Sequence, residues 1–237
     1  MTRLSVNLNK VALIRNARGS NIPDLIEVAK DCERFGAEGI TVHPRPDQRH
    51  VRYDDIEPLK NAITTELNIE GNPTAGFLRM VTEIQPHQCT LVPDAPDALT
   101  SDAGWDTVLH LDFLKDVIAE LRSNNIRTSL FIDPDFRMLE GAKAAGTDRI
   151  EFYTGPYAHD FLKDPNQAID RFSTAAEHCR TLHLGVNAGH DLNLDNLRFF
   201  HLQIPNLLEV SIGHALISDA LYYGLQNVIQ MYKHCLR

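Results

Sequence analysis

Short apolar runs alternate with longer segments of helical periodicity along the whole chain. Each run ends in a polar turn and is followed by a stretch in which apolar residues recur at helical spacing. This order predicts strands of a parallel sheet that alternate with helices. Most runs are largely apolar, as expected of strands covered on both faces. The eight runs interpreted as strands are residues 4–8, 39–43, 67–70, 88–92, 127–132, 149–153, 183–187 and 208–212.

The segments between these runs carry apolar faces at helical spacing. For the first, we expect Pro23 in the opening turn and Gly36 just after the end. The same periodicity recurs before the fifth strand, before the seventh, and after the eighth. These faces comprise Leu25, Val28, Ala29, Cys32 and Phe35; Phe113, Val117, Ile118 and Leu121; Ile169, Phe172, Ala176 and Cys179; and Leu221, Leu225 and Val228.

The number of strand–helix units favours an α/β fold of the (β/α)8 TIM-barrel type, with residues 1–237 as a single domain. No Gly/Ser-rich linker divides the chain, and the absence of Gly-x-Gly-x-x-Gly disfavours a doubly wound dinucleotide-binding sheet. The longest irregular stretch, Pro93 to Trp105, follows the fourth strand. A barrel would place this stretch over the mouth of the active site, so we regard it as a candidate lid.

Composition narrows the classes of function. The net charge of −9 argues against general nucleic-acid binding, which needs clustered Lys and Arg. No apolar run is long enough to span a bilayer, and the first residues, 1–10, do not have the pattern of a secretory signal, so we expect a cytoplasmic protein without a membrane partner. The cysteines have no paired spacing and are expected to be reduced: Cys32, Cys89, Cys179 and Cys235.

Polar residues follow or end most of the predicted strands. In a barrel of this kind the active site lies at the carboxyl ends of the strands, so a polar residue there has a stronger claim to function than one on a helix. The residues in question are Asn7, Asn9, His43, Glu70, Asp133, Glu151, Asn187, His190, Gly213 and His214.

Three of these are candidates for proton transfer. Glu70 has apolar neighbours that could raise its pKa, although a buried ion-pair partner would look the same. His43 opens a Pro-rich loop that also carries Arg45 and His50, a combination that suits proton transfer beside an anion but also occurs in surface loops. His190 is either a second acid or base, or the cap of the next helix.

Several positions favour anionic substrates. Gly213 and His214 begin the last helical region after the eighth strand, where backbone N–H groups bind phosphate readily. Arg15 and Arg18 could supply a second anion contact or could be solvated. Lys10 could form a Schiff base, although its place favours an anion contact. Despite eleven histidines, no His-x-His on the first strand and no His-Glu-x-x-His is present, so we expect no metal.

Seven ordered motifs across nearly the whole chain resemble the pyridoxine 5'-phosphate synthase (PdxJ) family. They are Val-Asn-Leu-Asn-Lys, Arg-Asn-Ala-Arg-Gly, Gly-Ile-Thr-Val-His, Asn-Ile-Glu, Leu-Val-Pro, Asn-Ala-Gly-His and Ser-Ile-Gly-His-Ala. The resemblance implies a homo-octamer of TIM barrels with no metal or organic cofactor. It implies a transferase that joins 1-deoxy-D-xylulose 5-phosphate to 3-amino-2-oxopropyl phosphate, and releases pyridoxine 5'-phosphate, phosphate and water in vitamin B6 biosynthesis.

The resemblance also implies roles for individual residues. His43 and Glu70 would accept protons and His190 would donate one. The aminooxopropyl phosphate would be held by Asn7, Arg18, His190, Asp191, Gly213 and His214, and the deoxyxylulose phosphate by Arg45, His50 and Thr100. Two departures change the local charge: Asn9-Lys10 replaces the Asp-His of many members beside the deoxyxylulose phosphate, and Asp191 stands where Gly is common.

Two other functions use the same residues. A metal-dependent sugar-phosphate epimerase or aldolase would also place His and Glu at strand ends. A phosphosugar-binding regulator would keep the pocket without turnover. Chelation separates the first from a synthase, and the effect of Glu70→Gln on binding and turnover separates the second.

Overall fold

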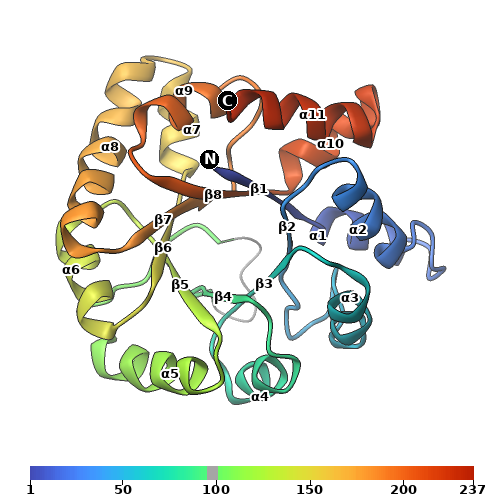
Figure 1. Ribbon diagram of the computed structural model, residues 1–237, viewed down its shortest axis with the longest axis horizontal. Helices are drawn as coiled ribbons and strands as arrows, with labels where there is room; N and C mark the ends of the chain where they lie inside the picture. The colour runs from blue at the N-terminus through green and yellow to red at the C-terminus, as the bar shows by residue number, and fades with distance from the viewer. Residues whose placement is uncertain (95–100) are drawn as a thin grey trace.

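Eight parallel strands close into a barrel that is surrounded by helices in the computed structural model, which describes residues 1–94 and 101–237 (Figure 1). The strands are β1 Arg3–Asn7, β2 Gly39–Val42, β3 Glu66–Gly71, β4 Gln88–Leu91, β5 Arg127–Ile132, β6 Arg149–Phe152, β7 Gly185–Gly189 and β8 Leu207–Ile212. The helices are α1 Asn9–Asn16, α2 Leu25–Arg34, α3 Ile56–Ala62, α4 Ala75–Ile84, α5 Leu111–Ser123, α6 Phe136–Ala145, α7 Gly155–Phe161, α8 Pro165–Leu182, α9 Leu197–Gln203, α10 His214–Tyr223 and α11 Leu225–Cys235, with a 3-10 turn at Tyr53–Asp55.

The predicted (β/α)8 barrel is confirmed. Every predicted strand is present, with ends that differ from the prediction by at most two residues. Each strand pairs in parallel with the next, and β1 pairs with β8 to close the sheet. The carboxyl ends of all strands therefore meet at one end of the barrel, which is the arrangement on which the predicted site depends.

The strands differ from the prediction in the character of their inner face. Ser5, Thr41, Asn68 and Thr90 lie side by side on β1 to β4 and are joined by hydrogen bonds of 2.7, 3.4 and 3.1 Å. Successive side chains of a strand point to opposite faces, so their apolar neighbours face the helices. The strands are thus apolar outside and polar inside, and the outer face includes Val6, Ile40, Ile69 and Leu91.

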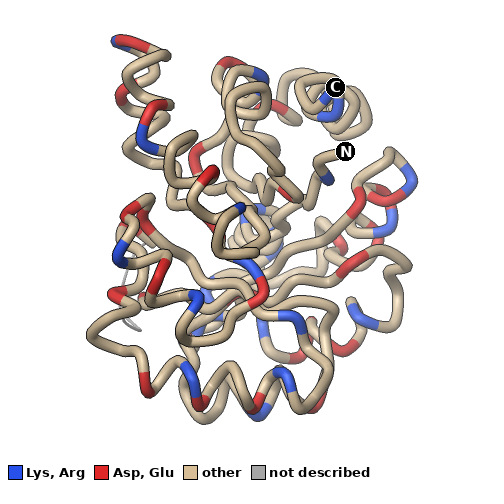
Figure 2. Tube along the Cα trace, turned by 60° about the vertical axis from the view of Figure 1, so that its left-hand side comes forward, with Lys and Arg blue, Asp and Glu red and all other residues tan. Residues whose placement is uncertain are grey.

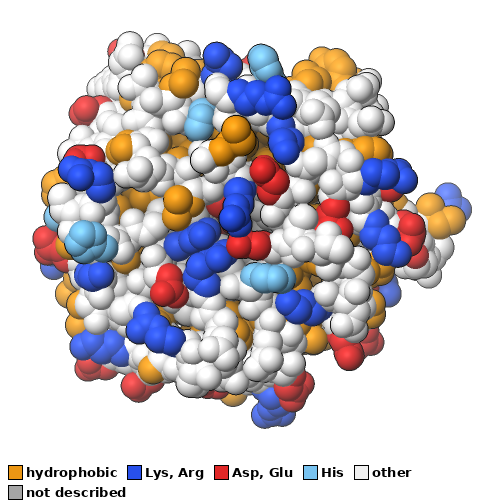
Figure 3. Space-filling model, in the orientation of Figure 1, with side chains coloured by type: hydrophobic (Ala, Val, Ile, Leu, Met, Phe, Trp, Pro, Cys, Tyr) orange, Lys and Arg blue, Asp and Glu red, His pale blue; other side chains and the backbone are white. Residues whose placement is uncertain are grey.

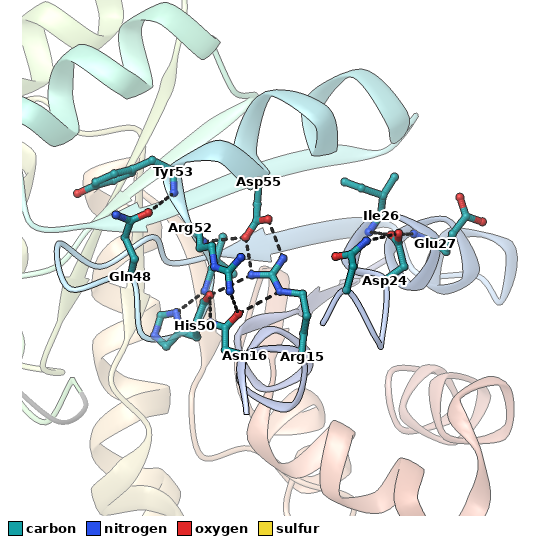
Figure 4. A network of polar contacts seen from close by, with 12 residues as sticks. Arg15, Asn16, Asp24, Ile26, Glu27, Gln48, His50, Arg52, Tyr53 and Asp55 are labelled. Atoms are coloured by element: carbon teal, nitrogen blue, oxygen red, sulfur yellow. Dashed lines mark hydrogen bonds and ion pairs between the residues drawn. The ribbon is translucent and has the colours of Figure 1, made fainter. Parts of the chain in front are cut away.

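The first predicted helix forms α2, but its start is set by a different residue. Asp24 is the N-cap, and its carboxylate accepts hydrogen bonds from the backbone N–H groups of Ile26 and Glu27 (Figure 4). Pro23 therefore precedes the cap and is not in the first turn. Gly36 follows the helix with φ of +103°, a conformation that glycine adopts at low cost, and the predicted end is confirmed.

Two predicted apolar positions do not belong to the core. Phe113 on α5 is 45% exposed, whereas the neighbouring Leu114 is fully buried and takes its place on the inner face. Leu221 is 75% exposed near the end of α10, and Gly224 separates this helix from α11. The periodicity identified the helices but not the rotation of α5 or the break after α10.

Ion pairs link the amino-terminal ends of β1, β3 and β5. Glu66 of β3 is bound by Arg127 of β5 at 2.7 Å and by Arg3 of β1 at 2.7 Å. Burial opposes ionisation of Glu66, but the two guanidinium groups outweigh it and lower its pKa to about 2. Charged side chains gather at the centre of the face seen in Figure 3, which looks along the barrel.

The outer surface carries interspersed acidic and basic residues along its helices (Figure 2). No helix of the described residues is long and apolar enough to cross a membrane.

Candidate active site

The first three strands bring four predicted site residues together. Asn7, at the end of β1, donates a hydrogen bond from Nδ2 to Oε2 of Glu70 at 3.4 Å. His43 follows β2, and its Nδ1 lies 3.9 Å from the same Glu70 oxygen. Asn9 accepts a hydrogen bond from the backbone N–H of His43 at 2.9 Å. These contacts fix His43 and Glu70 beside each other at the mouth of the barrel.

Glu70 is enclosed, and its ionisation is balanced near neutrality. Burial raises the pKa of this carboxyl group most strongly, and the positive charge that His190 can carry lowers it in part. Asp94 raises the pKa and Arg45 lowers it, and the resulting value is about 7. Glu70 can therefore both take up and release a proton at physiological pH.

His43 has the opposite bias. Its side chain is almost completely buried, and burial lowers the pKa of the imidazole well below its ordinary value. The cations Arg45 and Arg49 and the neighbouring His50 lower this pKa further. His43 is thus neutral at physiological pH and is available to accept a proton. A pocket beside it is lined by residues of the loops that follow β2, β3 and β4.

Arg45 forms a buried ion pair that the sequence did not indicate. Its Nη2 lies 2.6 Å from Oδ2 of Asp94, and both side chains are nearly inaccessible. The same oxygen accepts a hydrogen bond of 2.6 Å from the hydroxyl of Ser101. Asp94 directly follows the Leu-Val-Pro motif at the end of β4, and this position is the only feature of the sequence that points to Asp94 as a site residue. Arg45 and Asp94 both line the pocket beside His43.

His50 lies in the same loop as Arg45 and is also buried. Its Nδ1 accepts a hydrogen bond of 3.0 Å from the backbone N–H of Val51, so the neutral ring carries its hydrogen on Nε2. Burial, followed by the charges of Arg45 and Arg49, lowers the pKa of His50 to about 4. Lys10 contributes to the same field, which places its charge near His50.

Arg15 supports the loop after β2, and its guanidinium is bound within the protein. Its guanidinium is bound by both carboxylate oxygens of Asp55, at 2.7 and 2.9 Å, and also donates to the carbonyl of His50 (Figure 4). Asn16 donates to the carbonyls of Arg49 and His50. The interpretation of Arg15 as an anion contact is therefore wrong, because its donors are already engaged within the protein.

The remaining predicted phosphate contacts, Gly213, His214 and Arg18, differ in their surroundings. Gly213 is the N-cap of α10, and a Cβ there would lie 3.0 Å from Cβ of Asn7, so this glycine permits the close approach of β1 and β8. His214 begins α10 and is exposed. Arg18 lies in an exposed turn after α1 and has no hydrogen bond or ion pair with any described residue.

His190 follows β7 on the opposite side of the mouth. Its Nδ1 lies 2.6 Å from Oδ2 of Asp191. Burial lowers the pKa of His190, but Asp191, Glu70 and Asp94 outweigh it and raise the pKa above its ordinary value. The alternative of a helix cap is not supported, because α9 begins only at Leu197 and has Asn196 as its N-cap.

Three remaining strand-end residues have different surroundings. Asp133 after β5 accepts a hydrogen bond of 3.0 Å from the backbone N–H of Gly104, so it secures the chain where it returns from the β4 loop. Glu151 of β6 is buried, and burial together with Glu70 raises the pKa of its carboxyl group well above the ordinary value. Asn187 accepts a hydrogen bond from Arg149.

Thr100 and residues 95–99 of the candidate lid lie outside the described residues.

The four cysteines are free and buried. Among residues 1–94 and 101–237 no group of three or more His, Cys, Asp or Glu side chains is arranged to hold a metal ion. The expectation of a metal-free site stays a prediction.

The surroundings of His43, Glu70 and His190 shift their pKa values in different ways, and this arrangement suits proton transfer. A neutral imidazole, a carboxyl group that titrates near neutrality and an imidazole biased toward the protonated form share one polar mouth. Basic side chains and a helix N-terminus lie around them and can hold anionic groups.

Comparison with known proteins identifies the relatives of this chain. Residues 4–237 match the family described as Pyridoxal phosphate biosynthesis protein PdxJ. The chain is 59% identical over 232 residues to the Pyridoxine 5'-phosphate synthase of Flavobacterium johnsoniae, with 98% of each chain covered. It is 56% identical over 237 residues to the protein of the same name from Bacteroides fragilis, with 100% of both chains covered.

Solved structures are similar at the level of the fold. A protein of Aquifex aeolicus aligns with a TM-score of 0.65 at 14% identity, over 100% of this chain and 93% of that one. A phosphoribosyl anthranilate isomerase from Thermotoga maritima aligns with a TM-score of 0.59 at 11% identity, over 100% and 98% of the two chains. At these identities the likeness shows a shared fold and nothing about substrates.

The Arg15–Asp55 pair yields a prediction about stability. Asp55→Asn removes the negative partner of a buried guanidinium, and we expect the free energy of unfolding to fall by about 3 kcal/mol or more. Urea unfolding of the variant measures this loss. Asp54→Asn, a change of the same size at the exposed neighbouring position, serves as the control. A loss equal to that of the control would show that the pair does not hold the loop.

The raised pKa of Glu70 predicts that the site costs stability. Because the folded pKa of about 7 exceeds the ordinary value of 4.5, the wild type loses stability as pH rises from about 4.5 to 7, and Gln at this position does not titrate. Glu70→Gln should therefore stabilise the protein at pH 8 by up to about 3 kcal/mol, and by much less at pH 5. Denaturant unfolding at both pH values tests this, with Glu57→Gln at an exposed position of α3 as the control. An equal effect at pH 5 and pH 8 would contradict it.

Proposed function

We propose that this chain, which belongs to the Pyridoxal phosphate biosynthesis protein PdxJ family, is a pyridoxine 5'-phosphate synthase. In this reaction 1-deoxy-D-xylulose 5-phosphate and 3-amino-2-oxopropyl phosphate condense to pyridoxine 5'-phosphate, with release of phosphate and water. The observation that carries the proposal is the set of Glu70, His43 and His190 at one barrel mouth, with different proton affinities. A condensation that forms a carbon–nitrogen double bond and then a ring requires this mixture of acids and bases.

Each of the three residues has a role that follows from its surroundings. His43 is neutral and accepts a proton, for instance as the amine adds to the ketone. Glu70 accepts a proton as its carboxylate, and its pKa of about 7 lets it return that proton in a later step. His190 is biased toward its charged form and donates the proton that a leaving water molecule requires.

The two phosphate groups would bind on opposite sides of these residues. Arg45, His50, Asn9 and Lys10 lie on the β1–β2 side and would hold the deoxyxylulose phosphate, together with Thr100. Arg45 would then exchange or share its ion pair with Asp94. The aminooxopropyl phosphate would be bound by the other set: Asn7, Arg18, His190, the backbone of Asp191, Gly213 and His214.

The wider setting is also part of the proposal. Residues 1–237 would act as one catalytic domain in the cytoplasm, which is supported by the four free cysteines. Assembly into a homo-octamer would account for the exposed apolar side chains at the end of α10, where Leu221, Tyr222 and Tyr223 are 75%, 85% and 54% exposed. No partner other than small phosphorylated substrates and further copies of the chain is proposed.

Product formation is the direct test. Purified protein incubated with both substrates should release pyridoxine 5'-phosphate and inorganic phosphate in equal amounts, measured by chromatography and a phosphate assay. Activity should survive treatment with a chelator, because protons rather than a metal carry the reaction. Loss of activity on chelation, restored by a divalent metal, would favour the epimerase or aldolase alternative. Binding of both substrates without product would favour the regulator.

The pH dependence of the rate follows from the charges at the mouth. We expect kcat/KM to rise with pH through about 7, because Glu70 must be ionised to accept a proton, and to fall again once His190 loses its proton. Glu70→Gln should lower kcat on the order of 10²–10⁴-fold and abolish the limb near pH 7, with little change in KM. The exposed Glu57→Gln variant should behave as the wild type. A limb that persists in Glu70→Gln would assign it to another group.

A further inference from the structure

Asp191 makes a contact that the proposed binding role does not explain. Its side chain turns back onto the preceding residue, and its Oδ2 lies 2.6 Å from Nδ1 of His190. A carboxylate at this distance accepts a short, charge-assisted hydrogen bond from a ring N–H. The two side chains are 31% and 38% exposed, so the pair lies at the edge of the mouth and is partly shielded from water.

The backbone that carries the pair is held in place. The hydroxyl of the fully buried Thr154 accepts a hydrogen bond of 3.2 Å from the N–H of Asp191 and donates one to the carbonyl of Gly189. Asn196 donates to the carbonyl of Asp191 at 3.3 Å. His190 itself has φ of +54°, which is uncommon for a residue with a side chain. Surrounding contacts therefore determine this conformation.

Two aromatic rings pack against the imidazole. The ring of Tyr153 lies edge-on to His190 with centroids 5.9 Å apart, and Phe131 lies 6.4 Å away. Tyr153 also covers Gly155, where a Cβ would lie 2.3 Å from the phenolic oxygen, so any larger residue would displace the tyrosine. The ring of His190 is thus packed against two aromatic rings as well as bound at Nδ1.

We propose that Asp191 is a positioning residue for the proton donor: its carboxylate keeps the hydrogen of His190 on Nδ1 and leaves Nε2 as the atom that exchanges a proton with the substrates. This inference rests on the proposed function of His190. It concerns the side chain of Asp191, whose negative carboxylate would repel a phosphate group, whereas the proposed contact of this residue with the aminooxopropyl phosphate is through its backbone. The same geometry orients the general base in hydrolases that pair His with Asp.

The carboxylates that face His190 raise its pKa, as the hydrogen bond with Asp191 does. Asp191 lies on its own loop, Glu70 comes from β3 and Asp94 from the loop after β4, and each favours the protonated ring. Tyr153, which follows β6, is neutral at physiological pH, and burial raises its pKa further above the ordinary value. Of these groups, Asp191 is the one that is hydrogen-bonded to the ring, and after burial it has the largest effect on the pKa of His190.

The test separates charge from geometry. Asp191→Asn retains an oxygen that can accept from Nδ1 but removes the charge, and Asp191→Leu removes both. Asp195→Asn removes a charge from an exposed position of the same loop and is the control. The ligand-free proteins, labelled with 15N in the histidine rings, are titrated by NMR. His190→Asn identifies the signal of His190.

In the wild type we expect His190 to be protonated on Nδ1 when neutral. Asp191→Asn should keep this tautomer and lower the pKa of His190 by on the order of one unit, and the basic limb of kcat should move by the same amount while KM changes less than about twofold. Asp191→Leu should lose the tautomer, and Asp195→Asn should change neither property.

An unchanged titration of His190 in Asp191→Asn would overturn the proposal, as would a large rise in KM with an unchanged pH profile, which would make Asp191 a substrate contact. The NMR result does not depend on turnover. If the protein formed no pyridoxine 5'-phosphate, the proposed function would fail while the His190–Asp191 contact would still be measured.

Discussion

A carboxyl group enclosed in the mouth of the barrel, Glu70, is the constraint around which the other charges are arranged. Burial alone would keep it protonated, and the nearby Arg45 and His190 offset this only in part. If Arg45 were free of its pair, its charge would favour the carboxylate more strongly, but the guanidinium is already bound to Asp94 at 2.6 Å. The pKa of Glu70 near 7 therefore depends on an ion pair that does not touch it.

The loops that carry these groups are fixed by buried polar contacts that lie away from the chemistry. Arg15 and Asp55 secure the loop after β2, whereas Thr154 and Asn196 secure the loop after β7. Functional side chains commonly lie on loops that a rigid scaffold positions, and their geometry is only as precise as that support.

The sequence predicted those features that depend on local pattern. Strand spacing identified every β-strand, and the position of His43 and Glu70 at strand ends placed them correctly at one mouth. The pattern could not show that Arg15 is bound by Asp55, forty residues along the chain. It also missed Asp94, because partners across a barrel share no spacing in the sequence. The polar inner face of the strands was not predicted either. In strands of four or five residues, the alternation of polar and apolar side chains is too short to stand out from the apolar residues around it.

The two histidines show why residue type alone cannot assign a role in acid–base chemistry. His43 and His190 face the same space, and burial lowers the pKa of both. The arginines beside His43 add to this effect, whereas the carboxylates beside His190 outweigh it and raise the pKa of His190. The surroundings of His43 thus favour the neutral ring, whereas those of His190 favour the protonated ring. Neighbouring charges of opposite sign can therefore make a base of one buried histidine and an acid of another. In this chain those neighbours are Arg45 for the base and Asp191 for the acid, so the division of labour is set by residues that need not react themselves.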